Sequence, residues 1–476
     1  MTTTSPPAQP RDPQLAPALP AVGRTRRPSG RLTLTELQQL TETGQINTVL
    51  LAMPDMQGRL KGKRHHVRHF LDQLAPGGAE ACAYVLATDA DMRPLDGYRL
   101  TSWRSGYQDL HLRPDLETLR SVPWMPRTAL VHADAHYPEG RPMEVAPRQM
   151  LRRQLDHFAA LGLRAKVGIE TEFVLYHGTY EHHAATGYHD LRPVTTSNLD
   201  YALDHHPALD RYLRRLPETL ARAGLPVEAV KTESAPGQIE VTFPYGDPLA
   251  AADGHTVFQH AAKALAQRAG LAPTFMAAPE TGIASGLHLH VSLWHDDEPA
   301  LIDGDKLSEL AHHTVAGLLG ALPEFAPLYA PNVNSYKRYR PDSFAPTGFT
   351  WGRDNRTCAV RTTGHGRGLH FEIRLPGADA NPYLALAAVL AAARHGIHHE
   401  LTPPPPCRGN AYQIHAAPPL PAVLEDALDA FRDSEMAQHA FGPDVVEHYT
   451  RAAEVEVETH RHTVTDAERH RGFAHT

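Results

Sequence analysis

The sequence predicts an α+β protein with a small N-terminal domain and a larger C-terminal domain built on an antiparallel sheet. Three observations lead to this prediction: the length of 476 residues, four segments in which apolar and polar residues alternate, and amphipathic helices that begin near residue 145. A chain of this length is large enough for one large core and a smaller one. Alternation with a period of two is typical of strands with one apolar and one polar face.

Composition limits the function. An apolar content of 42% and a charged content of 21% are those of a globular protein outside the membrane. The net charge of -8 gives no general attraction to nucleic acid or to an anionic membrane, so we expect neither as a partner. The longest apolar run, Tyr383 to Ala393, is too short to span a bilayer. Three cysteines form no disulfide framework, which favours a reducing cytoplasm as the location.

The N-terminal part is predicted in two pieces. Residues 1–30 are rich in proline, lack periodicity and are expected to be disordered, without the apolar core of a secretory signal. Residues 31–138 are expected to form the small domain, because strand-like stretches such as TVLLAMPD and TALVHAD occur there.

The large domain is expected over residues 139–476. Pro147 opens a helix that Gly162 ends, and this helix has apolar residues on one face: Leu151, Leu155, Phe158 and Leu161. A second helix is predicted from the N-cap Asn381 through Pro382 to Gly396. Amphipathic helices such as LPAVLEDALDAFRD follow the proline run at 403–406.

Four predicted strands have an unusual polar face. In VGIETEFVLY (167–176), Glu170 and Glu172 point to one side, opposite Ile169, Thr171 and Phe173. The strands GQIEVTF, GLHLHVSLW and LHFEIRLPG repeat the pattern, with carboxylate, imidazole or guanidinium groups on the polar side: Glu240, His288, His290, Glu372 and Arg374. A solvated face is the simpler interpretation, but it would be a mixture of Lys, Ser, Thr and Glu. The composition favours a functional site.

The acidic residues predict a divalent metal centre. Carboxylates this close repel one another unless a cation neutralises them. Five carboxylates and one imidazole form an oxygen-rich set that suits Mg²⁺ or Mn²⁺ better than zinc or copper: Glu170, Glu172, Glu233, Glu240, Glu372 and His288. Five carboxylates exceed what one Mg²⁺ usually takes from a protein, so at least two ions are predicted.

With these residues in place, the sequence resembles the glutamine synthetase superfamily from about residue 30 to the C-terminus. The motifs that carry the resemblance occur in this order: DMQGRLKGKR, GIETEF, ESAPGQIE, SGLHLHVSLW, NSYKRYRPDSFAP, WGRDNR and FEIRLPGADANPYLA. The resemblance implies a β-grasp N-terminal domain and a catalytic domain with a curved antiparallel sheet. It also implies a homo-oligomer, a dodecamer of two hexameric rings with active sites between neighbouring subunits.

The resemblance also implies a reaction and a role for each residue. ATP would phosphorylate the γ-carboxylate of glutamate, and an amine would then attack the acyl phosphate, with metal ions and arginines stabilising the transferred charge. The first metal would take Glu172, Glu233 and Glu240; the second would take Glu170, His288 and Glu372. The substrates would be bound by Glu172, His288, Arg338, Arg374 and Phe344, with Arg338 and Arg374 holding the glutamate carboxylate, and ATP by His290, Ser292, Arg356 and Arg361. The catalytic arginines would be Arg338, Arg356 and Arg374; for any single arginine the alternative is a surface ion pair.

Three departures from the family pattern concern the substrates. Ammonia-dependent members have a glutamate where PDSFAP has Phe344, and an Asp-Gly-Ser-Ser segment where this chain has Asp96-Gly97-Tyr98. The Asn-Gly that helps hold glutamate is replaced by Ile283-Ala284. Tyr412, in RGNAY, is expected to be an ordinary tyrosine rather than a site of adenylylation.

These departures favour a γ-glutamylamide ligase that uses an organic amine, such as a polyamine, ethanolamine or methylamine. Phe344 would offer an aromatic wall to the amine, unless it only packs the closed flap. The proton acceptor would be one of Asp89, Asp91 and Asp96, among which the sequence does not choose. An ammonia-dependent glutamine synthetase is the alternative. A non-catalytic homologue is disfavoured because all six predicted metal ligands are present.

Overall fold

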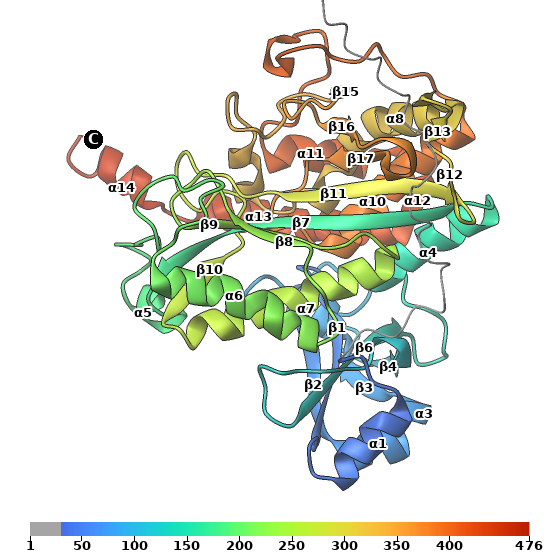
Figure 1. Ribbon diagram of the computed structural model, residues 1–476, viewed down its shortest axis with the longest axis vertical. Helices are drawn as coiled ribbons and strands as arrows, with labels where there is room; N and C mark the ends of the chain where they lie inside the picture. The colour runs from blue at the N-terminus through green and yellow to red at the C-terminus, as the bar shows by residue number, and fades with distance from the viewer. Residues whose placement is uncertain (1–29, 476) are drawn as a thin grey trace, which may run out of the picture.

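The computed structural model describes residues 30–475, so the predicted disordered tail lies outside the described residues except for residue 30. Residues 48–136 form a six-stranded mixed sheet at one end of the molecule (Figure 1). Its order is β2-β1-β6-β4-β3, with β5 paired to β6. The strands are β1 (Thr48–Pro54), β2 (Leu60–His66), β3 (Ala79–Cys82), β4 (Asp109–Pro114), β5 (Arg120–Ser121) and β6 (Thr128–His136). The two predicted strands are therefore β1 and β6, which pair in parallel.

Nine further strands form a second sheet. Its order is β15-β16-β17-β11-β7-β9-β8, with β10 paired to β7 and β12 to β11. They are β7 (Arg164–His177), β8 (Ala229–Thr232), β9 (Gln238–Thr242), β10 (Leu271–Thr274), β11 (Leu287–His295), β12 (Glu298–Pro299), β15 (Trp351–Arg353), β16 (Val360–Thr363) and β17 (His370–Ile373). A separate hairpin joins β13 (Ile302–Asp303) to β14 (Lys306–Leu307). The prediction of an antiparallel sheet is confirmed except for β15 and β16, which pair in parallel.

The apolar face of this sheet is covered by helices. Ile169 and Phe173 of β7 and Val241 of β9 are buried there, as the alternation predicts. The helices of the chain are α1 (Leu34–Glu42), α2 (Val67–His69), α3 (Ala75–Gly77), α4 (Pro147–Ala160), α5 (Tyr180–Ala185), α6 (Pro207–Arg222), α7 (Pro248–Gln267), α8 (Glu309–Ala321), α9 (Ala326–Tyr329), α10 (Pro382–His398), α11 (Leu424–Arg432), α12 (Glu435–Phe441), α13 (Pro443–His462) and α14 (Asp466–Gly472). Because helices cover the apolar face, the opposite, polar face can carry the predicted site.

Helix α4 begins at Pro147 as predicted and ends two residues before Gly162. Leu151 and Phe158 are buried, but the prediction that Leu161 shares their face is wrong, since Leu161 is 45% exposed. The reason is that the helix ends at Ala160, so Leu161 no longer follows the helical period, and Gly162 then turns the chain with a φ of +70°.

Helix α10 begins as predicted, with the Asn381 side chain accepting a hydrogen bond from the Tyr383 backbone N–H. It continues to His398, past the predicted end at Gly396. Gly396 lies inside the helix because α10 packs against α8 there. A Cβ on Gly396 would lie 2.5 Å from the backbone N of Gly317, and one on Gly317 would lie 2.2 Å from the carbonyl O of Ala392. The two glycines therefore allow the helix backbones to touch.

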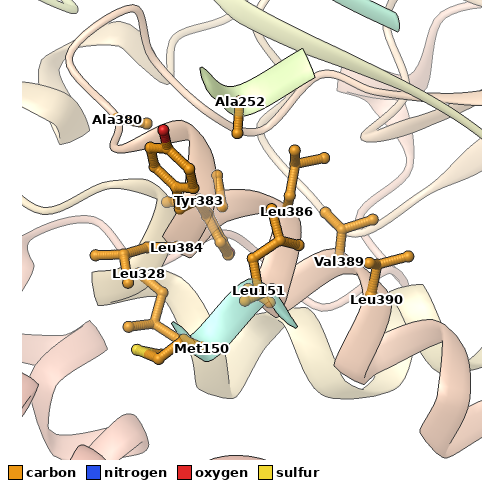
Figure 2. Close-up of a cluster of buried hydrophobic side chains, with 14 of the residues drawn as sticks. Met150, Leu151, Ala252, Leu328, Ala380, Tyr383, Leu384, Leu386, Val389 and Leu390 are labelled. Atoms are coloured by element: carbon orange, nitrogen blue, oxygen red, sulfur yellow. The ribbon is translucent and has the colours of Figure 1, made fainter. Parts of the chain in front are cut away.

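The centre of the main hydrophobic core is α10 (Figure 2). Its buried leucines and Tyr383 face Met150 and Leu151 of α4, Ala252 of α7 and Leu328 of α9. None of the helices within residues 30–475 combines the length and the hydropathy needed to cross a membrane.

Buried charges join the two sheets. The Arg148 guanidinium of α4 donates to Asp253 of α7 at 2.9 Å, to Asp115 after β4 at 2.6 Å and to Asp134 of β6 at 2.5 Å. Arg148 and Asp253 are both almost completely buried. One guanidinium therefore connects carboxylates of the small sheet to a helix that packs on the large one.

Candidate active site

The polar face of the large sheet forms the floor of a cavity of about 450 Å³. Strands β7, β9, β11 and β17 contribute four of the predicted acids and the imidazole, because these residues alternate with the apolar ones, and Glu233 directly follows β8. The residues that line the cavity include Glu170, Glu172, Glu233, Glu240, His288, Phe344, Arg356, Arg361, Glu372 and Arg374. The structure thus brings all six predicted metal ligands into one cavity.

Strand register places the ligands in facing pairs. Glu170 is opposite His288 across β7 and β11, Glu172 is opposite Glu240 across β7 and β9, and His290 is opposite Glu372 across β11 and β17. His288 Nδ1 lies 2.7 Å from Glu170 Oε1 and 3.7 Å from Glu372 Oε1. These contacts bring the predicted second set together.

Three groups have donor atoms within 4.8 Å of one another, as a metal centre requires: Glu172 with Glu233 and Glu240, Glu170 with Glu172 and His288, and Glu170 with His290 and Glu372. The first group is the predicted first metal set. His290, expected on the nucleotide side, also has its Nε2 3.7 Å from Glu170 Oε2. Carboxylate oxygens with one or two imidazoles form a donor set that fits hard divalent cations such as Mg²⁺ or Mn²⁺.

The pKa values of these acids differ because their neighbours differ. Burial, together with the negative charge of Glu170, raises the pKa of Glu240 to about 9. Burial also acts on Glu170, but hydrogen bonds from His288 and His290 hold its pKa well below the usual value. Glu372 is buried as well, and Arg374 and His288 lower its pKa to about 2. The excess negative charge is therefore concentrated around Glu240, within the first metal set.

The ammonium group of Lys231, on β8, lies next to these carboxylates. Its Nζ forms a close ion pair with Glu233, lies 3.8 Å from Glu240 and lies 3.1 Å from Asp200 Oδ1. The ammonium also lies 4.3 Å from the centre of the Tyr201 ring. Asp200, Tyr201 and Lys231 all line the cavity, and none of the three was predicted from the sequence. A signal was available for Lys231, which is two residues before Glu233 and so points to the same side of an extended segment.

Of the predicted arginines, Arg356, Arg361 and Arg374 line the cavity, whereas Arg338 is buried. Arg374 pairs with Glu372 and donates to the Phe344 carbonyl at 3.2 Å, and Arg361 donates to Glu372 at 2.8 Å. Arg356 is exposed at the cavity. Arg338 is buried behind His288 and donates to the carbonyls of Arg374 and Leu375 at 3.0 Å. Arg338 therefore does not line the cavity, although its Nη2 lies 3.4 Å from His288 Nε2.

The chain makes a close backbone approach at Gly286. Its N–H donates to Glu172 at 2.7 Å, and a Cβ there would lie 2.6 Å from His288 Nε2 and 2.8 Å from Arg338 Nη2. Ala284, which replaces a family glycine, also lines the cavity, and its carbonyl accepts from Gln238 at 2.8 Å. A side chain at position 286 would therefore displace the His288 ring and the Arg338 guanidinium.

A second cavity, of about 240 Å³, adjoins the first along β11. His290 and Ser292, predicted for ATP, both line it, and the Trp294 indole N–H donates to Ser292 at 2.8 Å. Lys166 Nζ lies 3.6 Å from the centre of the Trp294 ring. An aromatic ring and the cations of Lys166 and Arg367 are suited to a nucleotide, which combines a planar base with anionic phosphates.

The predicted proton acceptors lie elsewhere in the chain. Asp89 and Asp91 line a separate cavity with Tyr98 and Glu456, and the Asp96 carbonyl accepts from Arg451. Within residues 30–475 of one subunit, none of these three aspartates lines the carboxylate cavity. Tyr412 is partly buried and donates to the Ala345 carbonyl at 3.1 Å, as an ordinary packed tyrosine does.

Comparisons with known proteins agree with this geometry. Residues 144–471 match the glutamine synthetase catalytic domain. The chain is 46% identical over 457 residues to the γ-glutamylethanolamide synthetase GlnA4 of Streptomyces coelicolor, covering 96% of this chain and 98% of the relative. It is 35% identical over 427 residues to a glutamate–isopropylamine ligase of a Pseudomonas species, covering 88% and 93%. The solved structure of GmaS without ligand superposes with a TM-score of 0.79 at 29% identity, covering 92% of this chain and 99% of the GmaS chain.

The fold, the site and these relatives define a carbon–nitrogen ligase. The chain belongs to the glutamine synthetase family.

Proposed function

We propose that the protein is an ATP-dependent ligase that joins the γ-carboxylate of glutamate to an organic primary amine through γ-glutamyl phosphate. The observation that carries this proposal is the cavity itself. Six predicted metal ligands line it together with Phe344, which stands where ammonia-dependent relatives have a glutamate. The names of the relatives from Streptomyces coelicolor and Pseudomonas, which refer to amides of ethanolamine and isopropylamine, support an amine larger than ammonia.

The chain's own residues account for the first step. Glutamate would lie near Gly286 and Arg374, with its γ-carboxylate directed toward the carboxylate clusters. Bound Mg²⁺ or Mn²⁺, held by Glu172, Glu233 and Glu240 and by Glu170, His288 and Glu372, would neutralise phosphate charge. Arg356 and Arg361 would stabilise the γ-phosphoryl group as the carboxylate oxygen attacks phosphorus and ADP leaves.

In the second step the neutral amine attacks the carbonyl carbon of γ-glutamyl phosphate, and inorganic phosphate leaves with the electrons of the C–O bond. The amine must lose a proton, which a carboxylate at the cavity would accept as a general base. Asp89, Asp91 and Asp96 would reach a carboxylate cavity only from a neighbouring copy of the chain. The two-ring dodecamer that the family resemblance implies would have sites of that kind, and it remains part of the proposal, as does the cytoplasmic location.

The test is phosphate release by the purified protein with Mg²⁺, ATP and glutamate against a panel of acceptors. We expect release with ethanolamine or another primary amine, and formation of the corresponding γ-glutamylamide by mass spectrometry. Release with ammonia as the only productive acceptor would instead establish a glutamine synthetase. A protein that releases no phosphate with any acceptor would be a non-catalytic homologue.

A further inference from the structure

Two of the three cysteines lie together, close in the chain to the proposed phosphate-side arginines. Cys358, in the connection between β15 and β16, and Cys407, in the segment after the proline run, form a small buried cluster with Ala411. Both thiols are free, and the third cysteine, Cys82, lies on β3 of the other sheet. The proposed reaction uses neither Cys358 nor Cys407, so their pairing needs a separate explanation.

The backbones that carry the two thiols are tied together. The Cys407 N–H donates to the Trp351 carbonyl at 2.7 Å. Asn355 lies beside both cysteines: its carbonyl accepts from the Cys358 N–H at 3.3 Å, and its side-chain amide lies 3.7 Å from Cys407 Sγ. A Cβ on Gly352 would lie 2.7 Å from the Cys407 carbonyl O and 3.3 Å from Cys358 Sγ. The glycine therefore lets the two segments approach each other closely enough for the thiols to pack together.

The two thiols differ in their access to solvent. Cys358 is completely buried, whereas Cys407 is 8% exposed and lies between two exposed residues, Pro406 and Arg408. Burial raises the pKa of the Cys358 thiol to about 12, and the Cys407 thiol beside it adds to that rise. A small oxidant would therefore meet Cys407 first and find Cys358 protonated behind it. This is the arrangement of a reacting thiol with a resolving thiol.

We propose that Cys358 and Cys407 form a reversible disulfide when a peroxide oxidises them, and that this disulfide lowers the activity of the enzyme. The Cys407 thiolate attacks one oxygen of hydrogen peroxide, the O–O bond breaks, and the hydroxide that leaves takes up the proton that the thiol lost. The Cys358 sulfur then attacks the sulfur of the Cys407 sulfenic acid. The S–O bond breaks, and the Cys358 proton goes to the departing oxygen as a second water leaves.

The electrons and atoms balance in this sequence. The two thiols lose two electrons and two protons, which reduce one peroxide to two waters. A thiol reductant reverses the reaction by exchange with the disulfide. In a reducing compartment, protein disulfides are mostly of this transient, redox-sensing kind.

The disulfide would act on the cavity through the connection that carries Cys358. Arg356 and Arg361, the arginines proposed for the phosphate groups, lie on either side of Cys358 in the chain and line the carboxylate cavity. The carbonyl of the next residue, Ala359, accepts from the Arg374 N–H at 3.0 Å. Packed thiols must come closer to form a bond of about 2.05 Å, so the connection has to move and the guanidinium groups move with it. The effect on the rate rests on the proposed function, whereas the disulfide itself does not.

The test exposes the purified protein to hydrogen peroxide in the presence of a metal chelator, removes the peroxide and restores Mg²⁺. Peptide mass spectrometry should find the peptide of Cys358 linked to the peptide of Cys407. Formation of the γ-glutamylamide should fall at least about threefold, since small displacements of catalytic groups cost that much or more. Dithiothreitol should reverse both changes. Cys407→Ala and Cys358→Ala should each keep the activity of the reduced protein and lose the response, whereas Cys82→Ala should respond like the wild type.

The other outcomes overturn the proposal in different ways. Oxidation without a linked peptide would reject the disulfide, whatever the activity. A linked peptide without a fall in the rate would reject the effect on the cavity. A fall in the rate that persists in both Cys407→Ala and Cys358→Ala would place the damage elsewhere in the chain. A protein that forms an amide from no amine would reject the proposed function, and a linked peptide in that same protein would still support the disulfide.

Discussion

Glu172 and Glu240 face each other directly across β7 and β9, within a group whose ligand atoms lie within 4.8 Å of one another. Like charges in this arrangement destabilise a sheet unless a cation lies between them. We therefore expect Mg²⁺ or Mn²⁺ to raise the thermal unfolding temperature, because an ion that binds only the folded state stabilises it.

Glu240→Gln tests this relationship, since it keeps the shape and fixes the side chain in the neutral form that the raised pKa of Glu240 already favours without metal. The metal-free wild type must take up a proton there on folding, at a cost in stability that glutamine does not have. The metal-free variant should unfold at a higher temperature than the metal-free wild type, and its metal affinity should fall by at least about tenfold. Calorimetric titration with Mn²⁺ and thermal unfolding with and without the ion measure both effects. Glu218→Gln, on the exposed side of α6, is the control and should change neither. A metal affinity equal to that of the wild type would refute the assignment of Glu240 as a ligand.

Phe344→Glu should shift the acceptor preference toward ammonia. The substitution adds a negative charge that binds ammonium and can accept its proton, and it removes an aromatic surface for the amine. The ratio of kcat/KM for ammonium to that for ethanolamine should rise by at least about tenfold. Phe344→Leu, which removes the ring without adding charge, should weaken ethanolamine use without improving ammonia use. An unchanged ratio in Phe344→Glu would mean that Phe344 only packs the flap.

His255 should make the protein less stable in acid. It is 1% exposed on α7, neither ring nitrogen has a hydrogen-bond partner within the described residues, and burial lowers its pKa to about 3. As the pH falls below the unfolded-state value of about 6.5, the unfolded chain takes up a proton that the folded chain does not, so stability falls by up to about 1.4 kcal/mol per pH unit. This loss continues until the pH reaches the folded-state pKa.

The variant His255→Leu removes this titration and an unsatisfied polar group. Its free energy of unfolding should exceed that of the wild type, and the difference should be larger at about pH 5 than at about pH 8. Denaturant unfolding at the two pH values measures it. His470→Leu, at an exposed position of α14, should leave the pH dependence unchanged. Parallel curves for the wild type and His255→Leu would contradict the prediction.

Arg148→Met should destabilise the protein strongly. It would leave the buried Asp253 without its guanidinium partner and remove one of the two guanidinium groups that Asp115 and Asp134 share, and breaking a buried ion pair on one side costs about 3–5 kcal/mol. Arg152→Met is the matched control, because Arg152 pairs with the same Asp115 and Asp134 from a more exposed position and should cost less. Adding Asp253→Leu to Arg148→Met should recover part of the stability. Equal losses in the two single variants would contradict this account.

The sequence predicted the large sheet well because its strands combine alternation with a single buried face. Glu170, Glu172, Glu240, His288 and Glu372 could be assigned to one side of their strands before any register was known. Which strands are neighbours is a tertiary property, and for that reason the facing of Glu172 and Glu240 could not be predicted from the chain. The end of α10 was placed too early because Gly396 was interpreted as a helix stop, whereas the packing against Gly317 requires it inside the helix.

The site was predicted less completely where loops contribute. Asp200 and Tyr201 belong to a segment with no regular period, so no pattern indicates that they face Lys231. The burial of Arg338 could also not be predicted from the sequence. Its guanidinium is bound to backbone carbonyls, which carry no residue-specific signal. Asp89, Asp91 and Asp96 lie on a segment without regular secondary structure, so their position away from the carboxylate cavity could not be predicted either.

The contact of Gly317 with Gly396 has a consequence for how such an enzyme diversifies. Because any side chain at either position would push α8 away from α10, the helical layer behind the catalytic strands tolerates very little change there. The side chains of Tyr201 and Phe344 are exposed, so they can vary without moving the floor of the cavity. Under the proposed function, substitutions at the rim would therefore change the acceptor while the residues proposed for phosphoryl transfer stay the same.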